Sequence, residues 1–139
     1  MTPEECKDFI IEKIRTGKLA TVRSDGRPHV VPVWFDLDGD TLVFNTAESS
    51  VKALNMKRDS RVCICVDEEI PPFAFVQIEG TAEISTDPEA VKYWATRIGG
   101  RYMGAEQAET YGERNSAEGE LLVRINFTKI FGHKDVAGW

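Results

Sequence analysis

The sequence has few of the residues that bind metals or carry thiol chemistry. Its 139 residues include only three cysteines and two histidines, His29 and His133. Cys63 and Cys65 are two residues apart in a β run and point to one face, which supplies half of a zinc site at most. There is no Cys-x-x-Cys pair and no apolar leader after Met1, so we expect reduced thiols and a cytoplasmic protein. We also expect buried structural cysteines and no metal site.

Basic charge and long apolar runs are also in short supply. The 23 acidic side chains outnumber the 17 basic ones, which gives a formal net charge of −6. Nucleic acids and anionic membranes attract proteins with a basic field, so we expect no nucleic-acid and no membrane partner. No apolar run approaches the roughly 18–20 residues that a transmembrane helix needs. The length suits a soluble protein with a single domain, residues 1–139.

Common catalytic and nucleotide-binding motifs are missing too. Neither Gly-x-Gly-x-x-Gly nor Gly-x-x-x-x-Gly-Lys-Ser/Thr occurs, and there is no Gly-x-Ser-x-Gly. These absences exclude the usual phosphate-binding loops and a serine nucleophile on a strand-to-helix turn. We therefore expect the chemistry to belong to a bound cofactor, with no catalytic side chain.

Hydrophobic periodicity and capping residues predict three helices. The first begins at the capping box Thr2-Pro3-Glu4-Glu5 and is ended by Gly17. The second starts at a serine cap, Ser49 or Ser50, and the third ends at Gly99-Gly100. The second and third helices are expected over residues 49–58 and 87–100, and a loop or weak helix is expected over the polar residues 101–118.

Runs rich in β-branched and aromatic residues predict six strands. Asp25-Gly26 and Asp38-Gly39 separate the first three and suit tight hairpin turns, so these strands are expected to form an antiparallel meander. We expect a mainly β (α+β) fold: a six-stranded antiparallel barrel, closed or nearly closed, with flanking helices. The predicted strands are residues 19–23, 28–37, 41–46, 61–67, 73–85 and 121–131.

One segment has the features of a phosphate site. A strand ends, a small polar turn follows and a helix starts in the segment Asn45-Thr46-Ala47-Glu48-Ser49-Ser50-Val51-Lys52-Ala53-Leu54-Asn55. A cation in the first turn of a helix is unfavourable by about 0.3–1 kcal/mol. Lys52 therefore indicates an anion, most often phosphate, held between its ammonium and the free N–H groups. The simpler alternative is that Ser49 only caps the helix and Lys52 is solvated.

A second segment offers a surface for a planar ring. Pro32 lies within the predicted strand and cannot donate a hydrogen bond to a neighbouring strand. It therefore indicates an edge strand, a bulge, or a strand covered by something other than another strand, such as a flat ring. Trp34 and Phe73 either line a ring site or fill the core.

These segments, in this order, resemble the pyridoxamine 5′-phosphate oxidase-like split β-barrel superfamily. Within it, the nearest resemblance is to the flavin/deazaflavin oxidoreductases of subgroup B, which include F420-dependent biliverdin reductases. The resemblance extends over essentially the whole chain. It is based on Leu19-Ala20-Thr21-Val22, Asp25-Gly26-Arg27-Pro28-His29, Val31-Pro32-Val33-Trp34-Phe35, Leu42-Val43-Phe44-Asn45-Thr46, Ser50-Val51-Lys52 with Asn55, Arg58-Asp59-Ser60-Arg61, Phe73-Ala74-Phe75-Val76-Gln77-Ile78-Glu79-Gly80 and Asp135-Val136-Ala137-Gly138-Trp139.

The resemblance implies a homodimer with two cofactor grooves at the subunit interface. It implies that Pro32-Val33-Trp34 lies along the tricyclic ring of the cofactor. The strand end Asn45-Thr46-Ala47 and the helix start Ser50-Val51-Lys52 would hold the phosphate, and Asn55 would lie near the cofactor tail. The stretch Pro72-Phe73-Ala74-Phe75 would come from the other subunit.

One departure from the superfamily bears on the choice of cofactor. The flavin-oxidase pattern has an arginine and a lysine on the second strand for the FMN phosphate, whereas this chain has His29-Val30-Val31-Pro32-Val33-Trp34 there. The departure argues against vitamin B6 oxidation and tight FMN binding. The resemblance therefore implies an oxidoreductase that transfers a hydride from reduced coenzyme F420 to a conjugated small molecule, such as a biliverdin-like tetrapyrrole or another enone. The alternatives are an FMN-dependent reductase or oxidase of the same fold, and a non-catalytic protein that binds a cofactor or a tetrapyrrole.

Overall fold

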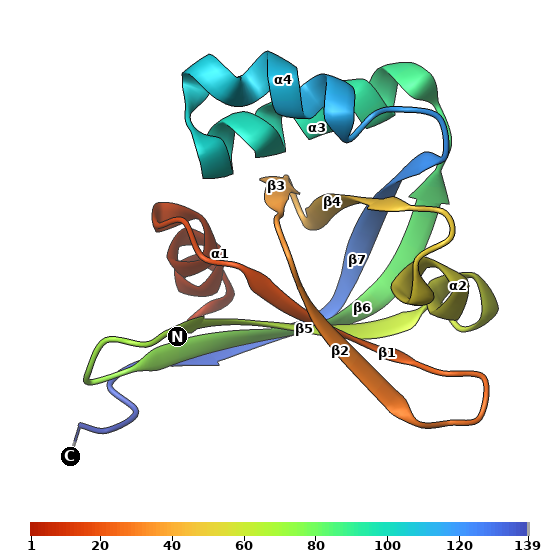
Figure 1. Cartoon of the computed structure of the whole chain (residues 1–139). Coiled ribbons are helices and arrows are strands. Elements are labelled where there is room, and N and C mark those ends of the chain that lie inside the picture. The colour runs from red at the N-terminus through yellow and green to blue at the C-terminus, as the bar shows by residue number, and fades with distance from the viewer. Residues whose placement is uncertain (139) are drawn as a thin grey trace.

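Seven antiparallel strands form one sheet in the order β2-β1-β5-β6-β7-β4-β3 (Figure 1). This computed structural model describes residues 1–138. The strands are β1 (Gly17–Val22), β2 (Pro28–Val33), β3 (Asp36–Asp38), β4 (Thr41–Ala47), β5 (Arg61–Glu68), β6 (Ala74–Ser85) and β7 (Glu120–His133). The helices are α1 (Pro3–Glu12), α2 (Val51–Arg58), α3 (Pro88–Met103), the 3-10 turn η1 (Ala105–Gln107) and α4 (Ala108–Arg114).

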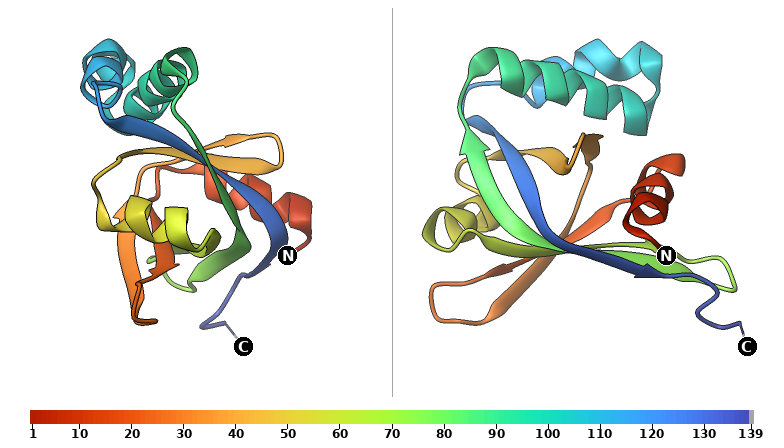
Figure 2. Two further views of the ribbon diagram at one scale, coloured as in Figure 1. Left: turned by 90° about the vertical axis from the view of Figure 1, so that its right-hand side faces the viewer. Right: turned by 180° about the vertical axis from the view of Figure 1, so that it is seen from behind.

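The sheet has seven strands rather than six because the run 28–37 divides at Trp34. Phe35 is fully buried, and its N–H donates to the Tyr102 hydroxyl at 3.2 Å instead of to a strand. The two halves, β2 and β3, lie at opposite edges of the sheet, next to β1 and β4. The expected meander is therefore wrong, while the edge position of the Pro32 strand is confirmed. The chain wraps from one edge to the other and forms an open antiparallel barrel (Figure 2).

The inward faces of the strands form the main core, and two helices close it. Large, fully buried side chains come from most of the strands, among them Leu19, Phe44, Ile64 and Ile78. The helix α1 covers one side of the barrel, and α2 lies on the opposite side (Figures 1 and 2). Both begin at the expected caps: the Thr2–Glu5 capping box is formed, and the Ser50 side chain accepts from Ala53 N–H. The helix α1 ends at Glu12, however, before the strand that starts at Gly17.

A second layer, α3 and α4, covers the outer face of β4 and β7 (Figure 1). The expected end of the third helix at Gly99-Gly100 is wrong, because α3 continues to Met103. Gly99 lies where α4 crosses α3, and a Cβ atom there would come within 2.5 Å of Tyr111 Cβ. Gly112 has the same role on α4, where a Cβ atom would come within 2.2 Å of Thr96 Oγ1. These glycines allow α3 and α4 to pack closely, and residues 101–118, expected to be a loop or weak helix, are largely helical.

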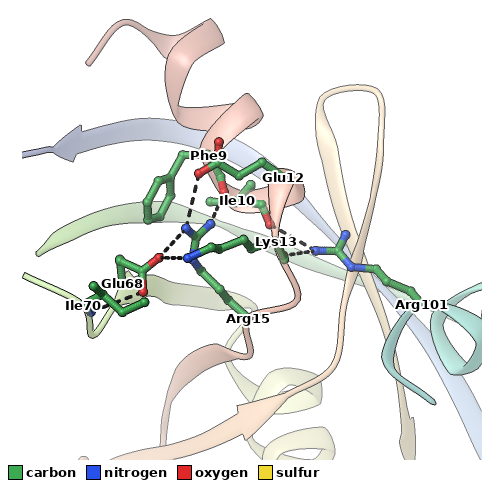
Figure 3. A network of polar contacts seen from close by, with 8 residues as sticks. All are labelled: Phe9, Ile10, Glu12, Lys13, Arg15, Glu68, Ile70 and Arg101. Atoms are coloured by element: carbon green, nitrogen blue, oxygen red, sulfur yellow. Dashed lines mark hydrogen bonds and ion pairs between the residues drawn. The ribbon is translucent and has the colours of Figure 1, made fainter. Parts of the chain in front are cut away.

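Two arginines fix the end of α1 to the rest of the molecule (Figure 3). Arg15 donates to the Phe9 carbonyl at 2.5 Å, and Arg101 of α3 donates to the carbonyls of Ile10 and Lys13. Glu68, at the end of β5, accepts from Arg15 at 2.8 Å and from Lys13 at 2.7 Å. Since α1 has no basic residue in its last turn, these contacts from outside the helix satisfy its C-terminal carbonyls.

The cysteines divide between the core and the outer face of the sheet. Cys6 is fully buried, as expected, but Cys63 and Cys65 lie half-buried on the outer face of β5. Burial raises the pKa of all three thiols. Within residues 1–138 no cluster of three or more His, Cys, Asp and Glu side chains is arranged to hold a metal ion. No helix in the same part of the chain is long and apolar enough to cross a membrane.

Candidate functional site

A cavity of about 290 Å³ lies between β2, β4 and the start of α2, next to α3. The expected ring strand and the expected phosphate turn both line it, although they are at least 11 positions apart in the sequence. The strand contributes Pro32, Val33 and Trp34, and the turn contributes Asn45, Thr46, Ala47 and Lys52. The other lining residues are Ala95, Ile98, Asn115 and Glu120.

Hydroxyl groups fix the turn between β4 and α2. The buried Thr46 hydroxyl is 2.9 Å from the Ser50 hydroxyl, which also accepts from Ala53 N–H at 3.2 Å. Ser50 N–H donates in turn to the Ala47 carbonyl at 3.1 Å. Since the first-turn N–H groups of a helix have no carbonyl partner within it, Val51 and Lys52 begin α2 with free backbone donors close to the cavity.

Lys52 supplies the positive charge of this cavity. Its side chain is half-buried, and burial lowers the pKa of its ammonium, while Glu120 opposes that shift from a distance. None of the ion pairs between residues 1–138 involves Lys52. A half-buried cation in the first turn of a helix is disfavoured twice, by desolvation and by the helix dipole. An anion bound at this point would remove both penalties.

Asn45 adds an unpaired acceptor to the same cavity. Its Nδ2 donates to the Val91 carbonyl of α3 at 3.1 Å, which fixes the amide. Its Oδ1 is buried and has no hydrogen-bond partner, and such atoms are uncommon in native structures. A ligand that fits this cavity therefore carries an anionic group for Lys52 and a donor for Asn45. A flavin-type cofactor, with a phosphate and a hydroxylated chain, meets both requirements.

Aromatic side chains of the helical layer hold the Trp34 wall of the cavity. Trp34 stacks on Tyr102 of α3, with the ring centroids 5.2 Å apart and the planes 4° from parallel, and contacts Tyr111 of α4 at 5.7 Å. The Tyr102 hydroxyl donates to the Arg15 carbonyl at 2.7 Å and accepts from Phe35 N–H. Burial raises the pKa of this hydroxyl. Trp34 therefore lies outside the barrel core and presents a fixed ring to the site.

Asn55 and Val51 lie on the other side of α2, away from this cavity. Asn55 is buried, donates to Thr21 Oγ1 at 3.0 Å and accepts from Arg58 at 3.1 Å, so its amide joins α2 to β1. Both residues line a separate pocket of about 240 Å³, together with Arg23 and other residues. The predicted place of Asn55 near a cofactor tail would require the tail to pass around α2.

The predicted aromatic stretch lies far from the cavity within one chain. Pro72 and Phe73 belong to the turn between β5 and β6, which is at the opposite end of the sheet from α2 (Figures 1 and 2). The backbone of the C-terminal tail donates to both carbonyls, from Val136 to Phe73 and from Ala137 to Pro72. Phe75 is half-buried at the start of β6. Their contribution to a site on a second subunit stays a prediction.

Four lining residues were missed by the sequence analysis. Ala95 and Ile98 are buried on α3, three residues apart, a spacing that is typical of a helix face packed on a core. Asn115 lies in the polar stretch 101–118, and Glu120 is at the start of a strand. The sequence feature that could have pointed to this region is the pair of tyrosines, Tyr102 and Tyr111, in an otherwise polar segment. Both pack against Trp34, which lines the cavity.

Comparison with known proteins agrees with this geometry. A family model described as pyridoxamine 5′-phosphate oxidase matches residues 2–134. The F420H(2)-dependent biliverdin reductase of Mycobacterium tuberculosis (strain CDC 1551 / Oshkosh) is 33% identical over 96 residues, which are 68% of this chain and 67% of that protein. A solved structure of a conserved hypothetical protein from Mycobacterium tuberculosis has a TM-score of 0.84 and 28% identity, covering 97% of this chain and 86% of the other.

A second solved structure, an F420 reductase, has a TM-score of 0.74 and 28% identity, and the match covers 89% of this chain and 94% of the other. The family match at residues 2–134 includes both segments that line the cavity, from Pro32 to Glu120. It also includes the whole seven-stranded sheet, from β1 to β7. This match shows that the chain belongs to the pyridoxamine 5′-phosphate oxidase family.

Proposed function

We propose that this protein is an oxidoreductase that uses coenzyme F420 and reduces a conjugated organic acceptor. The observation that carries the proposal is the cavity itself, where an unpaired Lys52 and an unpaired Asn45 Oδ1 lie beside the edge strand that ends at Trp34. Two relatives support it by their names, an F420H(2)-dependent biliverdin reductase and an F420 reductase.

The residues of the chain bind and position the cofactor. Lys52 and the free N–H groups of the α2 start would hold its phosphate. The backbone at Val33 and the Trp34 side chain would position the ring, and the α3–α4 layer would keep water from that side. When bound, the reduced deazaflavin supplies the hydride, so the protein needs no nucleophile or metal of its own.

The strand β2 favours F420 over FMN as the cofactor. It contains no arginine and no lysine, and its exposed positions include Val30 and Pro32. Among residues 1–138, Lys52 is the only cation that lines the cavity, so a doubly charged phosphate would have no second cationic side chain there. FMN is the alternative cofactor, because the family model is that of a pyridoxamine 5′-phosphate oxidase.

A homodimer is part of the proposal. The β2 edge exposes Val30, which is 65% exposed, and the β5–β6 turn exposes Phe73, which is 40% exposed. Apolar side chains at an edge strand and a turn are a reason for a second subunit to cover them. In this arrangement the Phe73 stretch of one subunit would complete the cavity of the other.

An acceptor assay under anaerobic conditions tests the proposed reaction. The protein is mixed with reduced F420 and with biliverdin, and then with simpler enones, while the fluorescence of oxidised F420 is followed. We expect oxidation that depends on both the protein and the acceptor. Binding of F420 without turnover of any acceptor would favour a non-catalytic carrier. Turnover with FMN alone would favour the FMN-dependent alternative.

A further inference from the structure

Two side chains of opposite charge lie on different walls of the cavity. Lys52 comes from the first turn of α2, and Glu120 is the first residue of β7. Both are half-buried, and they interact electrostatically without forming an ion pair. Burial raises the pKa of Glu120, an effect that Lys52 and Arg114 partly oppose.

The backbone fixes Glu120 beside the turn that precedes α2. Glu120 is the ladder partner of Ala47, the last residue of β4. Next to this pair, Glu48 N–H donates to the Gly119 carbonyl at 2.8 Å, and Glu120 N–H donates to the Ala117 carbonyl at 3.0 Å. The carboxylate therefore extends from a strand that is paired with the turn, and not from a free loop.

The lining residues carry one positive and one negative charge. The walls from β2, β4 and α3 are uncharged, and the charged lining groups are Lys52 and Glu120. Two further charged groups lie near Glu120 or near its neighbour Gly119. Arg114 of α4 interacts with Glu120, and Glu48 lies beside Gly119. The lining is therefore neutral overall. A site that binds a dianion is instead expected to have an excess of positive charge.

From this charge balance we infer that Glu120 selects the cofactor by the charge on its phosphate, accepting a phosphodiester and rejecting a phosphomonoester. A phosphodiester carries one negative charge, whereas a phosphomonoester carries up to two near neutral pH. Each ligand charge is attracted by Lys52 and repelled by Glu120, and the partial burial of both groups weakens the screening of that repulsion by water. Coenzyme F420 has a phosphodiester at this position and FMN has a phosphomonoester. The inference rests on the proposed function, and it makes Glu120 a specificity-determining residue rather than a catalytic one.

Binding titrations of Glu120→Gln test this inference without measuring activity. Wild type and variant are titrated with F420, with FMN and with riboflavin, which has the flavin ring but no phosphate. We expect the variant to bind FMN about tenfold more tightly than wild type, which is about 1.4 kcal/mol. F420 affinity should change less than about threefold, in line with its single phosphate charge. Riboflavin affinity should stay the same.

Two further variants serve as controls. Glu118→Gln removes an exposed carboxylate two residues away, and its affinities should equal those of wild type. Glu120→Asp keeps the charge and should keep the preference for F420 over FMN, even if the side chain volume affects folding. A gain in riboflavin affinity as large as the gain in FMN affinity would overturn the inference, because the effect would then act on the ring.

The outcomes separate this inference from the proposed function. Preferential F420 binding by wild type, with the same FMN-to-F420 affinity ratio in Glu120→Gln, would overturn the role of Glu120 alone. Tight FMN binding by wild type would overturn both. Weak binding of both cofactors by wild type, with FMN binding gained in Glu120→Gln, would overturn the proposed cofactor and support charge selection by Glu120. No binding of either cofactor by either protein would overturn both proposals.

Discussion

Trp34 and Tyr102 stack almost in parallel, 4° apart, although they are 68 positions apart in the chain. Trp34 follows the edge strand β2, and Tyr102 lies near the end of α3. The Tyr102 hydroxyl joins the Phe35 N–H to the Arg15 carbonyl. One tyrosine therefore connects the end of β2, the segment after α1 and the helical layer, and it supports the wall of the cavity.

Tyr102→Phe and Tyr102→Leu should separate the two contributions of this residue. The phenylalanine keeps the stack and loses two hydrogen bonds of about 0.5–1.5 kcal/mol each, so the free energy of unfolding should fall by about 1–3 kcal/mol with cofactor affinity little changed. The leucine also removes the support of Trp34, so cofactor affinity should fall as well. Urea denaturation and cofactor titration measure both effects. Equal loss of affinity in the two variants would show that the stack does not position Trp34.

Lys52→Ala should weaken cofactor binding without destabilising the free protein. It removes a charge-assisted contact of about 1.5–3 kcal/mol, so affinity should fall roughly tenfold to a hundredfold. Burial lowers the pKa of Lys52, which means that its charged form is less stable in the folded chain than in the unfolded one. The denaturation midpoint of the apo protein should therefore stay the same or rise slightly. Lys57→Ala, at an exposed site on the same helix, is the matched control and should change neither quantity.

A homodimer should form at micromolar concentration. Light scattering measures the mass, and Phe73→Ala tests whether the β5–β6 turn completes the cavity of a second subunit. Truncation of this exposed side chain should lower cofactor affinity while leaving the fold intact, because Phe73 is 40% exposed and has few core contacts within one chain. A monomeric mass together with full cofactor affinity would contradict a site built at an interface.

Glu68 should make the protein sensitive to acid. Hydrogen bonds from Lys13 and Arg15 lower the pKa of its carboxyl from 4.5 to about 2. A lowered pKa in the folded state stabilises the protein above the unfolded value, and this stabilisation is lost as the pH falls from about 4.5 to about 2. Glu68→Gln should show a smaller fall in the urea midpoint across that range. Glu69→Gln, at the exposed neighbouring position, should follow wild type, and identical curves for all three proteins would refute the role of Glu68.

The helix starts, the edge strand and the turn before α2 could be predicted from the sequence because they depend on interactions between residues that are close together in the chain. The capping box at Thr2 and the cap at Ser50 depend on side chains a few residues away, and both are present. Pro32 indicated an edge strand because a missing N–H is a local property, and β2 is at the edge. The strand end and the helix start near Lys52 were also predicted from local sequence, because the cap and the first turn of a helix depend on adjacent residues.

Contacts between distant segments account for what could not be predicted. Gly99 looked like a helix end, but it is the contact point between α3 and α4. The division of the 28–37 strand depends on the Tyr102 hydroxyl, which is far away in the sequence. Asn55 has a side chain that could contact a ligand, but its amide is already hydrogen-bonded to Thr21 and Arg58. Glu120 reaches the cavity only through its pairing with β4.

The most direct test of the account is a side-by-side titration of the purified wild-type protein with F420 and FMN, followed by absorbance and fluorescence. The unpaired Lys52, the facing Glu120 and the absence of arginine and lysine on β2 predict a protein that is colourless when purified. They also predict F420 binding at least about tenfold tighter than FMN binding, a difference of about 1.4 kcal/mol. Yellow protein with stoichiometric FMN after purification would contradict the account.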